Sequence, residues 1–224
     1  NVTSYVVPVP GETATGNNAL SKTIPVCFPV RVLWDDTHDS DGDSLTGNYL
    51  SLYQLLGLEE FAIDELTTEP LSSQVLSSYR ILVVIDPEYD FSTSEITAIH
   101  NWVAYGGKLL VIVDSGYPDS IDTLMAPYGI QMTGWYSGTG TTTNIASHTI
   151  TENVDSIFYN RAWDLDVTSP SQALAWTTDY LTLLSATTNV VVISDSNLMD
   201  NSHLEPADNK QLMLNIFNFM KNSA

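Results

Sequence analysis

Short, continuously apolar runs alternate along this chain with segments whose apolar residues recur at helical spacing. Four runs are typical of parallel strands buried by neighbouring elements, at residues 30–34, 81–85, 108–113 and 190–193. Three amphipathic segments predict helices, at residues 45–57, 92–107 and 208–222. This order predicts an α/β domain with a flavodoxin-like, doubly wound, mostly parallel sheet and helices on both faces.

The helix of residues 92–107 has the clearest start and stop signals. Ser92 or Thr93 can cap its amino end, with Glu95 inside the first turn, and Gly106-Gly107 ends it. Its apolar stripe consists of Ile96, Ile99, Trp102 and Val103. In the closing helix we expect four side chains to point inward: Leu212, Ile216, Phe219 and Met220.

Residues 116–150 interrupt the alternation. The segment SIDTLMAPYGIQM, residues 120–132, predicts a helix that leads into a strand. GWYSGTGTTTN, residues 134–144, predicts a loop because it is rich in glycine and threonine. Residues 182–186 predict a further strand.

The first 28 residues predict a β-hairpin ahead of the α/β domain. VTSYVVPV and ALSKTIPV are extended segments joined by the turn-rich GETATGNN. This pattern resembles the last two strands of the cell-adhesion-type Ig-like domains of bacterial and archaeal surface proteins. We therefore divide the chain into residues 1–28, the remnant of an Ig-like domain, and residues 29–224. An isolated hairpin is marginal in water, so it must pack in cis or against another chain, where it would make an oligomer.

Polar residues follow every predicted parallel strand. Right-handed crossovers place these strand exits on one edge of the sheet, where α/β proteins build their sites. The candidate catalytic residues there are Asp36, His38, Asp114 and Ser115, and the candidate ligand-binding residues are Glu88, Asp195 and Asn197. The alternative is that these acids only cap the helices that follow.

The acidic loop after the first parallel strand is a candidate calcium site. Asp39, Asp41 and Asp43 alternate with Ser40 and Gly42, which supplies oxygen ligands and a turn. The positions of these residues do not match the ligand spacing of an EF-hand, however. A solvated acidic loop is therefore the competing interpretation. Calcium is the only cofactor that the sequence suggests, and none is required.

The composition excludes several classes of protein. Seven Lys and Arg against 27 Asp and Glu give a net charge of −20, which opposes binding to nucleic acid or to anionic membranes. No apolar run approaches the roughly 20 residues that span a bilayer. A surface of Ser, Thr, Asn and acids with little Lys indicates a secreted or cell-surface protein, which we expect to be prokaryotic. The chain starts in mid-pattern, so we expect it to be part of a longer protein.

Four segments carry a second resemblance, which covers residues 29–221. They are the DxxH exit after residue 34, ILVVIDPEYDFSTSEITAIHNWVAYGGKLLVIVDSG, SHTITENVDSIF, and the ending VVVISDSNLMDN with DNKQLMLNIFNFM. These resemble the class I glutamine-amidotransferase-like superfamily, and in particular its non-catalytic branch of ThuA-like, gliding-motility and intraflagellar-transport domains. In working amidotransferases a cysteine nucleophile follows a central strand, and a His–Glu pair comes late in the chain.

The residues of this chain depart from that catalytic pattern. The strand exit reads Asp114-Ser115, and the one cysteine, Cys27, lies in an apolar approach to the first strand. His203-Leu204-Glu205 matches the late His–Glu pair in residue type. Its place in the sequence does not predict that these side chains face the strand exits. A hydrolytic triad of Ser115 with His38 or His203 lacks the G-x-S-x-G motif.

The resemblance therefore implies a non-catalytic interaction or scaffold module of a larger surface protein, which could assist a secreted hydrolase. Its partners would be neighbouring domains of the same polypeptide or other surface proteins. Two alternatives remain open: a hydrolase that uses the acidic and histidine residues of the strand exits, and a carbohydrate- or small-ligand-binding module. The exposed loop position of Trp135 favours the last of these.

Overall fold

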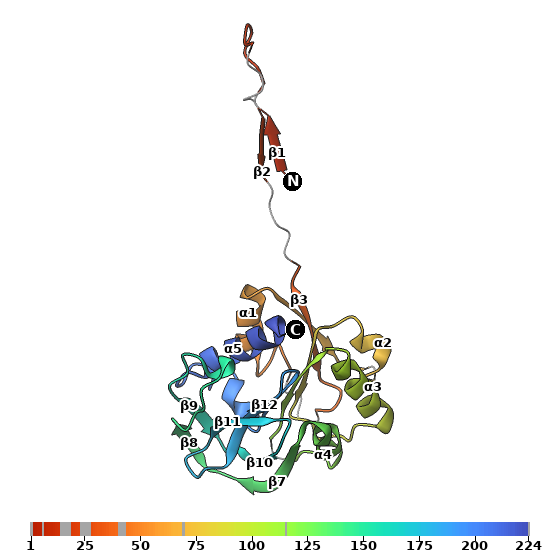
Figure 1. Ribbon diagram of the computed structural model, residues 1–224, viewed down its shortest axis with the longest axis vertical. Helices are drawn as coiled ribbons and strands as arrows, with labels where there is room; N and C mark the ends of the chain where they lie inside the picture. Colours follow the sequence, from red (N-terminus) through yellow and green to blue (C-terminus); the bar gives the residue numbers. More distant parts are fainter. Residues whose placement is uncertain are drawn as a thin grey trace.

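The computed structural model describes residues 2–5, 7–13, 19–22, 28–39, 44–68, 70–114 and 116–223. Its centre is a seven-stranded sheet in the order β11-β12-β13-β6-β5-β3-β4 (Figure 1). These strands are β3 (Val30–Asp35), β4 (Phe61–Leu66), β5 (Ile81–Ile85), β6 (Lys108–Ile112), β11 (Gln172–Trp176), β12 (Thr182–Ala186) and β13 (Val190–Ile193).

The five strands from β13 to β4 are parallel to one another. At one side of the sheet β12 pairs antiparallel with β13, and β11 pairs antiparallel with β12. The predicted fold class, an α/β protein with a mostly parallel sheet, is confirmed. The four strands whose exits carry the acidic residues all belong to the parallel part, so their carboxyl ends share one edge.

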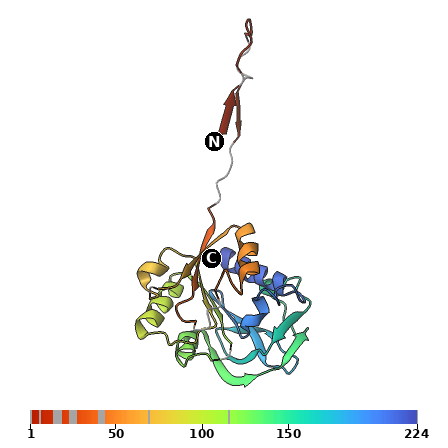
Figure 2. The same ribbon diagram turned by 180° about the vertical axis from the view of Figure 1, so that it is seen from behind.

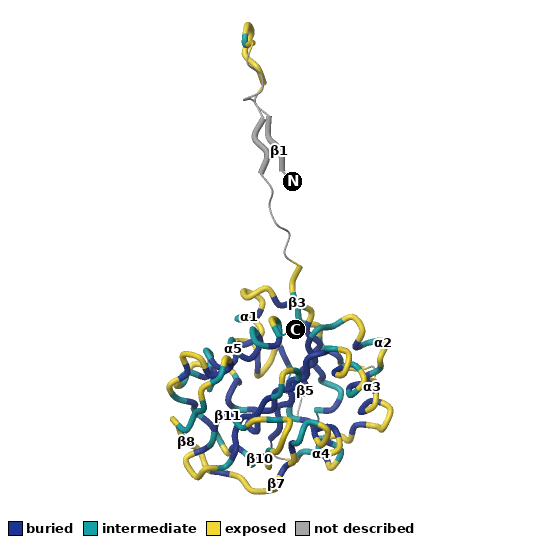
Figure 3. The backbone as a smooth tube through the Cα atoms, in the orientation of Figure 1, coloured by how far each residue is buried: buried dark blue, intermediate teal, exposed yellow. Residues whose placement is uncertain are grey.

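Helices cover both faces of the sheet (Figures 1 and 2). They are α1 (Leu50–Leu58), α2 (Ser73–Leu76), α3 (Thr93–Ala104), α4 (Ser120–Met125) and α5 (Asn209–Asn222). One apolar cluster joins α1 and α5 to the sheet, and a second joins α2, α3 and α4 to the opposite face. Figure 3 shows the buried strands between these layers. None of the described helices has the length and apolar character that a membrane crossing requires.

Adjacent residues of each central strand contribute to different clusters. In β3, Val32 and Trp34 pack under α1 and α5, whereas Leu33 packs toward α2 and α3. All five residues of β5 and of β6 are buried. Side chains alternate between the faces of a strand, so burial on both sides requires an unbroken apolar run, which is the pattern in the sequence.

The predicted start of α3 is confirmed. The Ser92 hydroxyl accepts a hydrogen bond from the backbone N–H of Glu95 at 3.3 Å. In return, the Glu95 carboxylate accepts one from the backbone N–H of Ser92 at 2.9 Å. This reciprocal capping box satisfies two backbone donors that the helix itself leaves without partners. In α5, Leu212, Ile216 and Met220 are buried as expected, while Phe219 is only half-buried.

The prediction of a loop at residues 134–144 was wrong for most of that segment. It lies in β7 (Ile130–Tyr136), which pairs antiparallel with β10 (Trp163–Val167), and in β8 (Thr139–Thr142), which pairs with β9 (Ile157–Asn160). Glycine and threonine pack little apolar surface here. The strands form because partners 15 to 37 positions further along the chain supply the hydrogen bonds.

Near the amino end, β1 (Val2–Tyr5) and β2 (Ala19–Lys22) pair antiparallel, with Val2 opposite Lys22. A hairpin ahead of the α/β domain is therefore present. Its assignment to an Ig-like domain, and the boundary at residue 28, stay predictions. Cys27 lies outside the described residues.

Candidate functional site

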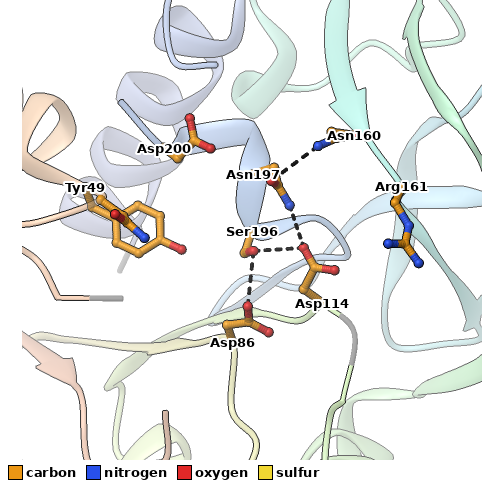
Figure 4. A pocket seen from close by; sticks show the side chains of 9 residues that line it. Tyr49, Asp86, Asp114, Asn160, Arg161, Ser196, Asn197 and Asp200 are labelled. Atoms are coloured by element: carbon orange, nitrogen blue, oxygen red, sulfur yellow. Dashed lines mark hydrogen bonds between the residues drawn. The ribbon is translucent and has the colours of Figure 1, made fainter. Parts of the chain in front are cut away.

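The exits of β5, β6 and β13 meet around a polar pocket at the carboxyl edge of the sheet (Figure 4). Its volume is about 250 Å³. Nine residues line it: Asn48, Tyr49, Asp86, Asp114, Asn160, Arg161, Ser196, Asn197 and Asp200. The pocket lies at the edge of the sheet where the sequence predicts a site, and its function as a site stays a prediction.

Ser196 lies between two carboxylates of the pocket, those of Asp86 and Asp114. Its hydroxyl lies 2.8 Å from Oδ2 of Asp114 and 3.3 Å from Oδ2 of Asp86. The side-chain amide of Asn197 also donates to Oδ2 of Asp114, at 2.8 Å. The exits of three parallel strands thus bring polar side chains into direct contact, as Figure 4 shows.

Asp195 is fully buried beneath the residues that line the pocket. It holds two of the segments that contribute to the pocket lining. Its carboxylate accepts hydrogen bonds from the backbone N–H of Asn160 at 2.7 Å and of Asn197 at 3.0 Å. Burial raises the pKa of Asp195 to about 7, with the charge of Asp114 adding to the rise and the backbone hydrogen bonds opposing it. The role that the structure gives Asp195 is to join the β13 exit to the β9–β10 turn.

His38 is not part of the pocket wall. It is 6% exposed, stacks on Phe91 with ring centroids 3.8 Å apart, and pairs with Asp35 at 2.7 Å. Its other ring nitrogen lies 3.7 Å from Glu95. Burial alone would lower the pKa of His38, but the hydrogen bonds and charges of Asp35 and Glu95 outweigh it and raise that pKa. This cluster connects the β3 exit to the start of α3.

The remaining predicted residues lie elsewhere. Asp36 and Glu88 are half-buried and do not line the pocket, and Glu88 donates its backbone N–H to the carbonyl of His38 at 2.7 Å. Trp135 is 72% exposed on β7 and is also outside the pocket wall. Ser115 lies outside the described residues.

The predicted calcium loop is described only in part. Asp39 is half-buried, while Asp41 and Asp43 fall outside the described residues. Across the described ranges, no group of three or more His, Cys, Asp or Glu side chains is arranged to hold a metal ion. Calcium binding by this loop therefore stays a prediction.

Sequence reasoning missed half of the pocket. Asn48 and Tyr49 come from the turn before α1, Asn160 and Arg161 from the β9–β10 turn, and Asp200 from the segment after β13. The Asn160-Arg161 pair follows an alternating apolar segment, which could have indicated a turn. No local signal in the sequence indicates that this turn reaches the exits of β5 and β6.

The pocket has hydrogen-bonding groups and charge, and none of the described histidines is hydrogen-bonded to the Ser196 hydroxyl. The Ser196 hydroxyl faces carboxylates rather than a histidine. His203 pairs with Asp200 at 2.9 Å and stacks on Phe158, with ring centroids 5.1 Å apart. Such a wall can orient a polar ligand through several hydrogen bonds.

This arrangement of sheet, helices and edge pocket is the class I glutamine amidotransferase-like fold. The chain belongs to the family described as a domain of unknown function, DUF4350, whose model matches residues 49–217. No curated protein matches the sequence.

Solved structures share the fold at low sequence identity. The mmIFT52 N-terminal domain superposes with a TM-score of 0.74 at 16% identity, covering 85% of this chain and 97% of that one. A ThuA-like protein from Bacteroides uniformis gives 0.63 at 11% identity, covering 89% and 95%. A glutamine amidotransferase from Thermotoga maritima gives 0.51 at 13% identity, covering 86% and 92%.

Proposed function

We propose that this chain is a non-catalytic, amidotransferase-like interaction module that acts by binding at the carboxyl edge of its sheet. It would serve as a scaffold within a larger secreted or cell-surface protein and could assist a secreted hydrolase. Neighbouring domains of the same polypeptide or other surface proteins would be its partners. The resemblance of residues 1–28 to an Ig-like domain supports a place within a larger surface protein.

One observation carries the proposal. The polar side chains at the strand exits are hydrogen-bonded to one another, and His38, the histidine at the exit of β3, is held in a separate cluster. Ser196 donates toward Asp114 and Asp86, while His38 is held between Asp35, Glu95 and Phe91. The bases within hydrogen-bond reach of Ser196 are the carboxylates of Asp114 and Asp86, and no described histidine joins its hydroxyl in a Ser–His pair.

The experiment is a search for turnover with matched variants. The chain, Asp114→Asn and Ser196→Ala are each incubated with glutamine and with chromogenic esters and glycosides over a wide pH range. We expect no product above the buffer rate for any of the three proteins. Turnover by the original chain that is lost in Asp114→Asn would overturn the proposal and favour a hydrolase.

A further inference from the structure

The two edges of the central sheet differ in how their backbone groups are satisfied. Beside β11, the backbone N–H of Ala146 donates to the carbonyl of Leu174 at 2.8 Å, and the chain itself covers that edge. The opposite edge is β4, which pairs on one side only, with β3, among the strands that the structure describes.

The pairing with β3 shows which backbone groups of β4 point away from the sheet. The carbonyls of Glu60 and Leu66 accept hydrogen bonds from the β3 segment at 2.9 and 3.0 Å. Successive residues of a strand direct their backbone groups to opposite sides, so Phe61, Ile63 and Glu65 turn their N–H and C=O outward. No backbone group of the residues that the structure describes bonds to them.

An open edge of this kind is a template for one more strand. The β4 strand of a second copy fits it in an antiparallel register centred on Ile63. In that register Ile63 lies opposite its own equivalent, and Phe61 lies opposite Glu65 of the second copy. Each such pair exchanges both of its N–H···O=C bonds, so every outward group of β4 gains a partner.

The same register places no like charges directly opposite each other. Ala62 lies opposite Asp64 of the second copy, and Glu65 lies opposite its Phe61. Like charges directly opposite destabilise a strand pair, so this distribution permits self-association. The Asp64 carboxylate is also paired within its own chain, because Arg31 lies 2.7 Å from it.

Exposed apolar side chains on α1 are an independent indication of a partner on this side of the molecule. Leu50, Tyr53 and Leu58 are 37%, 36% and 82% exposed, and no other described helix carries an exposed large apolar residue. The helix leads directly into β4 and packs against it. Antiparallel pairing of two β4 strands in one sheet puts both α1 helices on the same face, beside the shared strands.

We propose that this chain forms a two-fold dimer in which the β4 strands of two copies pair antiparallel about Ile63. The two sheets then become one continuous sheet, and the α1 helices shield each other's exposed apolar side chains. This interface is separate from the pocket that contains Asp114 and Ser196. Turnover by the chain would therefore remove the proposed function and leave the dimer intact.

Sedimentation equilibrium of the full chain over a wide range of concentration tests the dimer. Ile63→Lys puts two ammonium groups opposite each other at the two-fold axis. Ala62→Lys instead puts an ammonium group opposite Asp64 of the second copy. Thr97→Lys, at an exposed position of α3, is the matched control for the change in net charge.

We expect the original chain to dimerise. Relative to Thr97→Lys, Ile63→Lys should weaken dimerisation at least about tenfold, and Ala62→Lys should strengthen it about threefold at low salt. A monomer at every concentration would overturn the inference. So would a dimer that Ile63→Lys and Thr97→Lys affect equally, because it would form through another surface.

Disulfide cross-linking tests the register, and it stays informative if Ile63→Lys does not fold. In a Cys27→Ser background, Ile63→Cys places the two thiols on residues whose Cα atoms are about 5.5 Å apart, within the reach of a disulfide. Glu65→Cys is the register control, because its two copies are offset by about 13 Å along the strands.

Mild oxidation should convert Ile63→Cys largely to a covalent dimer and leave Glu65→Cys mostly monomeric on a non-reducing gel. Equal cross-linking of the two variants, or none in Ile63→Cys, would overturn the proposed pairing.

Discussion

The imidazole of His38 and the carboxylate of Asp35 form a buried ion pair, with 2.7 Å between Nδ1 and Oδ2 and side-chain exposures of 8% and 0%. Oδ1 of the same carboxylate accepts from the Thr37 hydroxyl at 2.6 Å. The pair therefore fixes the turn that carries the chain out of β3 and beneath α3.

His38→Ala should destabilise the protein by about 3 kcal/mol, because it leaves the Asp35 carboxylate buried without its partner. The pKa of His38 is raised in the folded state. Its contribution to stability is thus fully present below the unfolded pKa of about 6.5 and is lost as the pH rises through the folded value. Urea unfolding of both proteins at about pH 5.5 and about pH 8.5 measures this, and the variant should lose more at the lower pH. An equal loss at both pH values would show that only packing against Phe91 matters.

Asp195 titrates near neutrality in the folded protein, since burial raises its pKa to about 7. The unfolded chain releases this proton near pH 3.9, so the folded state binds more protons between these limits. Stability from this group therefore falls as the pH rises from about 4 to about 7 and is constant above. Asp195→Asn removes that dependence. Its loss of unfolding free energy should be larger at about pH 5 than at about pH 7.5, and the reverse order would contradict the assignment.

Ser92→Ala should cost about 1 kcal/mol of unfolding free energy, because it removes the capping hydroxyl of α3. Asn101→Ala is the matched control, since Asn101 is an exposed residue within the same helix. The control should change stability by less than about 0.5 kcal/mol. Chemical denaturation of the two variants compares them directly, and similar losses would exclude a specific capping effect.

Gly129→Ala should be strongly destabilising, by about 2–4 kcal/mol. Gly129 has φ +73°, and a Cβ there would clash with the backbone oxygen of Thr168, at the point where the chain enters β7. Gly138→Ala is the control, because no atom lies within 4 Å of a Cβ at that position. Thermal melting should separate the variants clearly, and equal melting temperatures would refute the steric argument.

Local patterns along the chain are sufficient to predict the parallel part of the fold. Unbroken apolar runs at β5, β6 and β13 can be buried only between two layers, and the Ser92–Glu95 spacing dictates the start of α3. Local propensity and periodicity decide such features. They also placed Asp114, Asp195 and Asn197 at one edge, since parallel strands end together.

The residues that those strand exits face are set by contacts between segments that are distant along the chain. Asn160 and Arg161 reach the pocket because β9 and β10 fold back to it, and His38 is withdrawn from it because Phe91 and Glu95 surround the ring. The strands β7 and β8, in the Gly- and Thr-rich segment, likewise depend on partners distant in sequence. Such contacts leave no local pattern, because their free energy comes from surfaces that meet only after the chain has folded.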